Sequence, residues 1–356
     1  MLDYIIVGGG LAGIAFAETA LQNSKSVLVI NDDSQNSSKI AAGLYNPVIL
    51  KRFTQVWQAN EQIALLHEFY AKLEIKLGVK LDYPIPLLRK FYSVEEQNNW
   101  FTASDKPNLS PFLSSKIITT KYKAIDSPLG FGEVLHSGFI DTAPLLDAYH
   151  HYLQTIDSYL SQTFDHSQLV VEEATIHYGN LKAKHIVFAE GYGMLSNPFF
   201  ATLPLDGAKG ELLLIKAPDL NLDVIMKTGI FILPLGNDIY KVGATYNWDD
   251  KTNTPTAAAK EELLAELNEL IQCDYEVVNH QAGIRPTVKD RRPMIGTHPN
   301  YKNLHLLNGL GTRGVMLAPA MAKMLFENIE NETALDAHVD IKRFKNLNSI
   351  FKMDGV

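Results

Sequence analysis

YIIVGGGLAG, residues 4–13, is the stretch of the sequence that decides the fold. A short apolar run with β-branched residues leads directly into glycines, which predicts a buried strand that ends in a tight turn. The next segment is rich in alanine, so we expect a helix that lies close on a sheet. The apolar run at 27–30, VLVI, then predicts a second buried strand. Strand, helix and strand in this order predict a right-handed βαβ unit with parallel strands.

The glycines of this stretch have the G-x-G-x-x-G spacing of dinucleotide-binding turns. In such turns the first glycine permits the sharp bend, the second lets a pyrophosphate approach the backbone, and the third lets helix and strand pack closely. The start of the helix adds free N–H groups and a partial positive charge, which favour a phosphate. We therefore expect a cofactor-binding turn made by Gly8, Gly10, Leu11, Ala12 and Gly13.

The end of the second strand departs from the usual dinucleotide pattern. An acidic residue is normal there, because it binds the ribose hydroxyls. This chain has Asn31 at that position, followed by Asp32 and Asp33. Either Asn31 or Asp32 can bind the ribose, and the sequence leaves the choice open. The two acids would repel a 2′-phosphate, which disfavours NADP.

Length, charge and cysteine content limit the class of protein. A chain of 356 residues favours two domains. The formal net charge of −8 argues against a nucleic-acid partner, although it does not exclude a local basic patch. No apolar run approaches the roughly 20 residues of a membrane span, and we expect no signal peptide before the first strand. With Cys273 as the single cysteine, we expect a cytoplasmic protein.

The middle of the chain predicts a different architecture. Apolar residues from Ile63 to Leu77 step by three and four, which predicts a helix that Gly78 terminates. Short apolar runs at 212–215, 230–233 and 239–242 predict antiparallel strands. Because no linker separates two halves, we expect a Rossmann-type α/β domain interwoven with an α+β domain built on an antiparallel sheet.

Four further segments carry a resemblance to a known family. They are AAGLYNP at 41–47, AEG at 189–191, GIRPTVKDRRPMIG at 283–296 and GLGTRGVMLAP at 309–319. With the first glycine turn, and in this order, they resemble the D-amino-acid oxidase/glycine oxidase family of FAD-dependent oxidoreductases. The resemblance spans essentially the whole chain, and its two C-terminal blocks are the most specific.

The resemblance implies a fold of the glutathione-reductase-2/DAO-like type with FAD as cofactor. The FAD-binding domain is then expected at 1–50, 135–205 and 280–345, and the substrate-binding domain at 51–134 and 206–279. We expect non-covalent FAD, because neither Cys273 nor the first histidine, His67, matches a position of covalent attachment in the family. The resemblance places beside the flavin Ala42, Gly43, Gly191, Gly309, Gly311, Thr312 and Gly314.

The same resemblance assigns candidate catalytic residues. Arg285 matches the arginine that clamps the substrate carboxylate, a task that suits a planar guanidinium; the alternative is a structural ion pair with Asp290 or a nearby acid. Arg313 is a second candidate, although glycine oxidases carry their arginine one position earlier, where this chain has Thr312. Tyr246 is expected to line the amine pocket or to belong to the core. The adjacent His150 and His151 diverge on a helix, so we expect no metal site.

The implied reaction is oxidation of a C–N bond in a small amine or amino acid. Hydride passes to flavin N5, the resulting imine is hydrolysed, and the electron acceptor is oxygen or a carrier. Two alternatives remain. GLGTRG-x-x-x-AP also resembles the FAD domain of an enzyme that oxidises a side chain on the wobble uridine of tRNA. The other alternative is a non-catalytic module that binds FAD or NAD.

Overall fold

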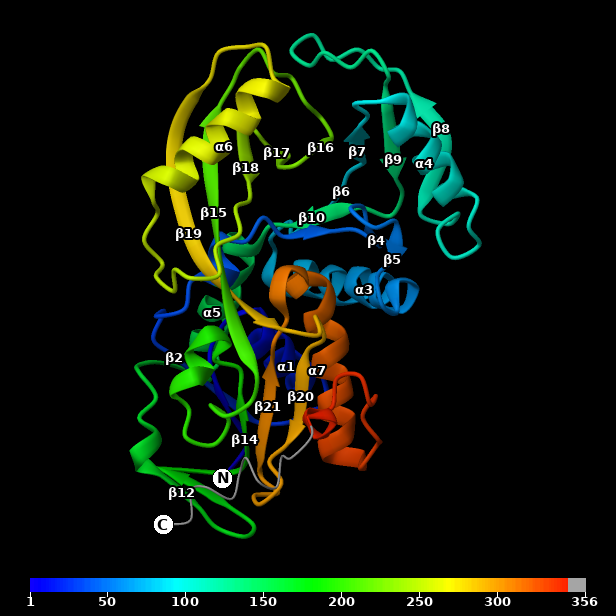
Figure 1. Ribbon diagram of the computed structural model, residues 1–356. Coiled ribbons are helices and arrows are strands. Elements are labelled where there is room, and N and C mark those ends of the chain that lie inside the picture. The colour runs from blue at the N-terminus through cyan, green and yellow to red at the C-terminus, as the bar shows by residue number, and fades with distance from the viewer. Residues whose placement is uncertain (345–356) are drawn as a thin grey trace.

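The computed structural model describes residues 1–344 and contains two large sheets, each with eight strands (Figure 1). The first sheet has a parallel centre, in which β1 pairs with β2 on one side and with β14 on the other, and β14 pairs with β21. Its strands are β1 Leu2–Val7, β2 Val27–Asn31, β11 Tyr159–Ser161, β12 Leu169–Val171, β13 Ile176–Tyr178, β14 Leu181–Phe188, β20 Met294–Thr297 and β21 Leu304–Asn308.

The predicted βαβ unit is confirmed. Helix α1 (Leu11–Gln22) joins β1 to β2, and both strands are buried on two faces. Tyr4 and Ile6 pack into one hydrophobic cluster with α1, whereas Ile5 and Val7 belong to a second cluster on the opposite face. A strand covered on both sides needs apolar residues at every position, which explains the unbroken run before the glycines.

Helix α7 (Gly314–Asn331) begins directly after the C-terminal glycine block and packs beside α1 (Figure 1). Helix α5 (Thr142–Thr155) also contacts α1. Within residues 1–344 the first and last α-helices are therefore neighbours, and both glycine segments lie at the same end of the first sheet. None of the helices formed by residues 1–344 has the length and apolar character that crossing a bilayer requires.

The second sheet has the strand order β19-β15-β18-β17-β16-β7-β9-β8, with a single parallel pair between β16 and β7. All three predicted antiparallel strands are confirmed within it, and helix α6 (Ala257–Leu270) packs on β15 and β18. Its strands are β7 Leu87–Lys90, β8 Leu113–Ile118, β9 Phe131–Val134, β15 Leu205–Lys216, β16 Ile225–Lys227, β17 Phe231–Gly236, β18 Ile239–Gly243 and β19 Glu276–Val288.

Smaller elements lie between the two sheets (Figure 1). Helix α3 (Ala59–Leu77) ends at Gly78 in the left-handed conformation with φ 67°, as the sequence predicts. The other elements are α2 Ser37–Ile40, β3 Leu44–Tyr45, β4 Val48–Ile49, β5 Thr54–Gln55, β6 Asp82–Pro84 and β10 Gly138–Ile140, with α4 Val94–Ser104 beside β8.

The two sheets share the chain in alternating segments. Strands of the first sheet come from 2–31, 159–188 and 294–308, and those of the second from 87–134 and 205–288. Figure 1 shows β15 and β19 running from the second sheet down towards the first. The expected domain boundary at residue 280 therefore falls inside β19, and residue 345 lies outside the described residues.

Candidate FAD and substrate site

A cavity of about 1270 Å³ lies where the two sheets meet. Its lining includes both the first glycine turn, Gly8 to Ala12, and the last glycine loop, from Gly309 to Val315. The two segments touch, because a Cβ atom added to Gly314 would lie 3.0 Å from Leu11 Cδ1. Pockets for drug-sized ligands measure about 300–1,000 Å³. This cavity therefore has room for a dinucleotide together with a second small ligand.

The first glycine turn has the shape of a phosphate cradle. Gly8 has φ 103°, and a Cβ atom there would lie 2.4 Å from the carbonyl oxygen of Ala189. A Cβ atom on Gly13 would lie only 1.8 Å from Gly8 O, so helix α1 can approach β1 only with glycine at this position. The N-terminus of α1 opens into the cavity, and Ser38 Oγ accepts from Leu11 N–H at 3.1 Å. A pyrophosphate fits this cradle through backbone N–H groups and the Ser38 hydroxyl.

The structure separates the roles of Asn31 and Asp32, which both line the cavity. Asn31 Oδ1 accepts from Gly9 N–H at 2.9 Å, and its amide nitrogen donates to Asp33 and to the Tyr159 hydroxyl. Asparagine is needed here because the side chain both accepts and donates. Burial raises the pKa of Asp32, but hydrogen bonds from Ser34 and Thr163 outweigh it and keep the carboxylate ionised. Asp32 is therefore the better candidate for the ribose hydroxyls.

His150 also supports the glycine turn, a role that the sequence did not reveal. Its Nε2 lies 2.7 Å from Gly9 O and donates to that carbonyl. A helix from a distant part of the chain thus fixes the turn. Within residues 1–344, no group of three or more His, Cys, Asp or Glu side chains is placed to hold a metal ion.

The small-residue loop Ala41-Ala42-Gly43 is clamped from two sides. The carbonyl of Ala41 accepts from Thr142 Oγ1 and from Lys241 Nζ, each at 3.1 Å. Gly43 has φ 68°, and a Cβ atom there would lie 1.8 Å from Ile140 O. Burial lowers the pKa of Lys241, which reaches the loop from strand β18 of the second sheet. Lys241 therefore ties the substrate side of the molecule to a loop of the FAD side.

Asn308 joins two further glycine turns of the cavity, at Gly191 and at Gly309. This buried side chain donates to Gly191 O at 2.9 Å and accepts from Gly309 N–H at 2.7 Å. Gly191, Gly309 and Gly311 all have positive φ, between 57° and 74°. Thr312 is exposed, and Gly314 is the first residue of α7. At these glycines the backbone carries no side chain, and the resemblance predicts that the flavin ring lies beside them.

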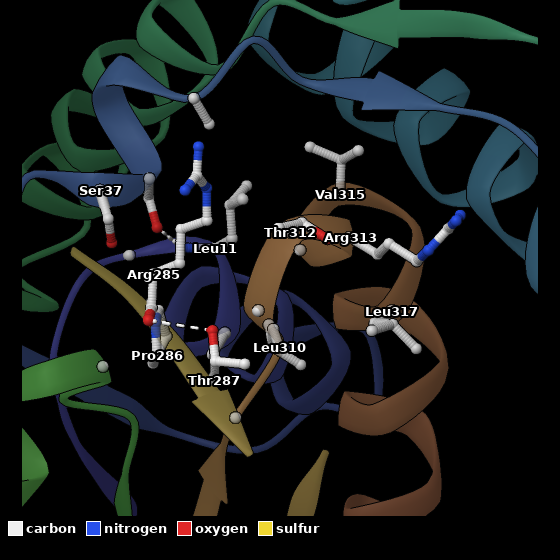
Figure 2. A pocket seen from close by; sticks show the side chains of 18 of the residues that line it. Leu11, Ser37, Arg285, Pro286, Thr287, Leu310, Thr312, Arg313, Val315 and Leu317 are labelled. Atoms are coloured by element: carbon white, nitrogen blue, oxygen red, sulfur yellow. Dashed lines mark hydrogen bonds between the residues drawn. The ribbon is translucent and has the colours of Figure 1, made fainter. Parts of the chain in front are cut away.

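Arg285 rises from β19 into the cavity (Figure 2). Its Nη1 donates to Thr245 O at 3.2 Å, and its Cζ lies 4.4 Å from the centroid of the Tyr246 ring. Burial lowers its pKa. Asp290 does not pair with Arg285, because it binds Arg343 with an Nε–Oδ2 distance of 2.8 Å. No carboxylate oxygen of residues 1–344 lies within 4.0 Å of the Arg285 guanidinium.

Gly210 on β15 makes room for the Arg285 side chain. A Cβ atom on Gly210 would lie 1.9 Å from Arg285 Nη2, which is closer than any non-bonded contact. The glycine is thus required by the arginine that crosses over it. The sequence did not reveal this pair. The two residues lie on the neighbouring strands β15 and β19, which are far apart along the chain.

Arg313 and Tyr246 line the same cavity in different ways. In Figure 2 the side chains of Arg285 and Arg313 point in different directions. Arg313 Nη1 donates to Asn46 O at 2.9 Å, and burial lowers the pKa of this arginine to about 10. Arg313 therefore links the last glycine loop to the AAGLYNP segment. Tyr246 is 54 % exposed and lies under Arg285, so it is not a core residue.

The glycine oxidase of Bacillus subtilis is similar to this chain along nearly its whole length. The two are 26 % identical over 355 residues, which cover 93 % of each chain. Among solved structures, the glycine oxidase of Bacillus cereus superposes with a TM-score of 0.75 at 20 % identity. That match covers 94 % of this chain and 96 % of the other, and at this identity it shows the fold alone.

Two bifunctional proteins are also similar. One is the bifunctional protein ThiO/ThiG of Trichormus variabilis, 24 % identical over 96 % of this chain and 55 % of its own. The other is the tRNA 5-methylaminomethyl-2-thiouridine biosynthesis bifunctional protein MnmC of Haemophilus ducreyi, 23 % identical over 93 % of this chain and 56 % of its own. The chain thus spans about half the length of these two relatives.

A family model described as DAO, FAD dependent oxidoreductase, matches residues 3–328. The match contains every glycine segment that lines the cavity, and the cradle at Gly8 to Gly13 fits the pyrophosphate of the cofactor. The chain therefore belongs to the DAO family of FAD-dependent oxidoreductases, and its cofactor is FAD.

Proposed function

We propose that this oxidoreductase oxidises the C–N bond of a small amine that carries a carboxylate. The observation that carries the proposal is Arg285, a half-buried guanidinium with no carboxylate partner among residues 1–344, in the cavity that also holds the FAD cradle. An unpaired cation in such a place is costly, and an anionic ligand with two oxygens offsets the cost. Amino-acid oxidation by similar proteins, such as glycine oxidase, agrees with this role.

The residues around the cavity divide into those that hold FAD and those that hold substrate. We assign the pyrophosphate to Gly8, Gly10, Leu11, Ala12 and Gly13, and the ribose to Asp32, with Asn31 as support for the turn. We assign the isoalloxazine ring to Ala42, Gly43, Gly191, Gly309, Gly311, Thr312 and Gly314. When bound, FAD would supply the hydride acceptor for oxidation of the C–N bond, and the resulting imine would be open to hydrolysis by water.

The protein's own contribution is orientation and electrostatics. Arg285 fixes the substrate carboxylate, which leaves the amine carbon no freedom to turn away from the cofactor. Tyr246 covers one face of Arg285 and excludes water from it. The N-terminus of α7, at Gly314, lies on the cavity and favours negative charge on whatever binds beside it. With the roles assigned in this way, hydride transfer requires no general acid or base from the protein.

We also propose that FAD is held without a covalent bond. Cys273 packs in the cluster of the second sheet, and His67 binds Asp82 with an Nδ1–Oδ2 distance of 2.6 Å. Neither residue lines the cavity. Acid precipitation of the yellow protein should therefore release all of the flavin into the supernatant as free FAD.

An anaerobic reduction screen tests the function. The holoenzyme is mixed with amino acids, N-methyl amino acids and polyamines, and flavin absorbance is followed. Amines with a carboxylate should bleach the flavin, whereas polyamines should not. Reoxidation by air with release of peroxide would identify an oxidase, and reoxidation only by a quinone or carrier would identify a dehydrogenase. If no amine bleaches the flavin, a non-catalytic FAD-binding module becomes the better description.

A second candidate function is oxidation of a tRNA side chain. The similarity to the tRNA-modifying bifunctional protein, together with arginines at the cavity mouth, supports it. Binding of tRNA would depend steeply on salt, because phosphate contacts release counterions. A gel shift with bulk tRNA at two salt concentrations tests this function. With a formal net charge of −8, we expect no shift at either concentration.

A further inference from the structure

The arginines of this chain are distributed unevenly. The sequence has seven, and the cavity is lined by five of them: Arg52, Arg285, Arg291, Arg292 and Arg313. The other two are paired, Arg89 with Glu96 at 2.6 Å and Arg343 with Asp290 at 2.8 Å. Within residues 1–344, none of the five has a carboxylate oxygen within 4.0 Å. The arginines without a carboxylate at this distance are thus the arginines of the cavity, although Asp336 acts on Arg292 through a longer-range Coulomb interaction.

Acidic side chains do not balance these cations. Lys51 and Lys227 also line the cavity, which makes seven cationic side chains against two acidic ones, Asp32 and Glu190. Both acids already have partners: Asp32 accepts from Ser34, and Glu190 accepts from Asn197 and contacts His166. In a chain with a net charge of −8, seven cationic side chains around one cavity favour anionic occupants, of which the pyrophosphate of FAD is one.

Two of these arginines are held in place at the cavity rim by tryptophans. Residues 289–293 connect β19 to β20 and lie between Trp248 and Trp57. Arg291 Cζ lies 5.2 Å from the Trp248 ring centroid, and Arg292 Cζ lies 5.3 Å from that of Trp57. A cation–π contact restrains the guanidinium and leaves N–H groups free to donate to an anion. The rim arginines, Arg291 and Arg292, are therefore preorganised for an anion.

The rim arginines form a separate position from Arg285. Arg285 lies three residues before the end of β19 at Val288, a rise of about 10 Å along a strand. Arg291 and Arg292 follow that end. This separation suits two anionic groups on one molecule better than a single carboxylate. One group would bind at Arg285 and the other at the rim arginines.

We propose that the cavity binds an amine with two anionic groups, a carboxylate held by Arg285 and a second carboxylate or phosphate held by Arg291 and Arg292. This inference rests on the proposed function, because it takes the first group to be the carboxylate of the amine substrate. An extended polyanion fits less well. The arginines converge on one cavity, and the net charge of the rest of the chain repels a long nucleic acid.

Binding of three probe ligands to the holoenzyme tests the proposal. They are propionate with one anionic group, succinate with two carboxylates, and 3-phosphonopropionate with a carboxylate and a phosphonate; perturbation of the flavin spectrum reports each Kd. At least one dianion should bind the wild type at least about tenfold more tightly than propionate, the gain of one charge-assisted interaction. Which dianion binds more tightly distinguishes a carboxylate from a phosphate.

Variants then assign the preference to the rim arginines. In R291Q/R292Q the preference for dianions should fall to about one, while the Kd of propionate stays unchanged. Lys289→Gln is the matched control, because Lys289 belongs to the same connection but does not line the cavity, and it should keep the full preference. An unchanged preference in R291Q/R292Q overturns the proposal. If that variant does not fold, binding of both dianions to the wild type no tighter than that of propionate overturns it as well.

The same preparations separate this inference from the proposed function. If no amine reduces the flavin but the dianion preference depends on the rim arginines, the proposed function fails and the anion position stands. If amines with one carboxylate reduce the flavin and no dianion is preferred, the inference fails alone. Saturable binding of tRNA that requires Arg291 and Arg292, without preference among the small ligands, would replace the small dianion by RNA.

Discussion

Arg285 lies over the ring of Tyr246, with its Cζ 4.4 Å from the ring centroid. The ring covers one face of the guanidinium, and Gly210 leaves room for its edge. A cation–π contact stabilises the positive charge without neutralising it, as a carboxylate partner would. The arginine therefore remains available to an anionic ligand although burial lowers its pKa.

Removal of the Tyr246 ring should weaken the binding of carboxylates. We expect Tyr246→Ala to raise the Kd of propionate between about twofold and thirtyfold, the equivalent of a cation–π contact worth about 0.5–2 kcal/mol. Tyr246→Phe keeps the ring and should bind like the wild type. A loss in Tyr246→Phe equal to that in Tyr246→Ala would show that the hydroxyl, not the ring, is what matters.

Arg285→Ala should separate cofactor binding from substrate binding. The variant should stay yellow, because no residue of the phosphate cradle contacts Arg285. The Kd of propionate should rise about tenfold to a hundredfold, as expected for loss of a hydrogen-bonded charge. Flavin content and the titration of the flavin spectrum check both statements. Loss of the flavin itself would assign Arg285 to the cofactor and contradict its substrate role.

Gly210→Ala should act through Arg285. The added Cβ atom would lie 1.9 Å from Arg285 Nη2, so the guanidinium must leave its position. We expect a loss of carboxylate affinity close to that of Arg285→Ala. In the double variant the two losses should not add, because Arg285→Ala leaves no guanidinium for the new Cβ atom to displace. Additive losses would mean that Gly210 affects the site by another route.

The sequence predicts those parts of the fold that depend on local pattern. The βαβ unit follows from an apolar run, three glycines and an alanine-rich helix, and α3 ends where Gly78 permits the left-handed conformation. The sequence did not reveal that β15 begins at Leu205, seven residues before the apolar run at Leu212. Its first half contains Lys209, which is fully buried and binds Asp250, so burial there depends on an ion pair that no local pattern shows.

The candidate site was predictable only where backbone conformation fixes the residue type. Glycines at Gly8, Gly13 and Gly43 are required by close contacts or positive φ, and such positions leave a recognisable spacing. The residues that hold the turns of the site are His150 on α5, Lys241 on β18 and Asn308 at the end of β21. Each makes one hydrogen bond to a backbone carbonyl of the site, and a single contact of this kind leaves no periodicity to detect.

Gly13→Ala should abolish cofactor binding. The new Cβ atom would lie 1.8 Å from Gly8 O, so α1 must move away from β1 and the phosphate cradle must open. We expect colourless protein and a loss of stability of more than about 2 kcal/mol. Ala15→Gly, in the same helix, is the control: it should lower the stability by about 1 kcal/mol and keep the flavin. Yellow protein with normal FAD content from Gly13→Ala would contradict the cradle.

Lys227 should give the protein a stability that rises with pH. Burial lowers its pKa from the ordinary 10.5 to about 8, with nearby Arg89 acting in the same direction. Between these two pH values the unfolded chain binds more protons than the folded one, so the free energy of unfolding increases as pH rises from 8 to 10.5. The change is on the order of 3 kcal/mol for a shift of this size. The methionine side chain cannot titrate, so Lys227→Met should lack this increase. The free energy of unfolding of the wild type should therefore rise relative to that of the variant as pH increases from 8 to 10.5. Urea unfolding of both proteins at several pH values measures the difference, and a constant difference from pH 7 to 11 would show that Lys227 keeps an ordinary pKa in the folded protein.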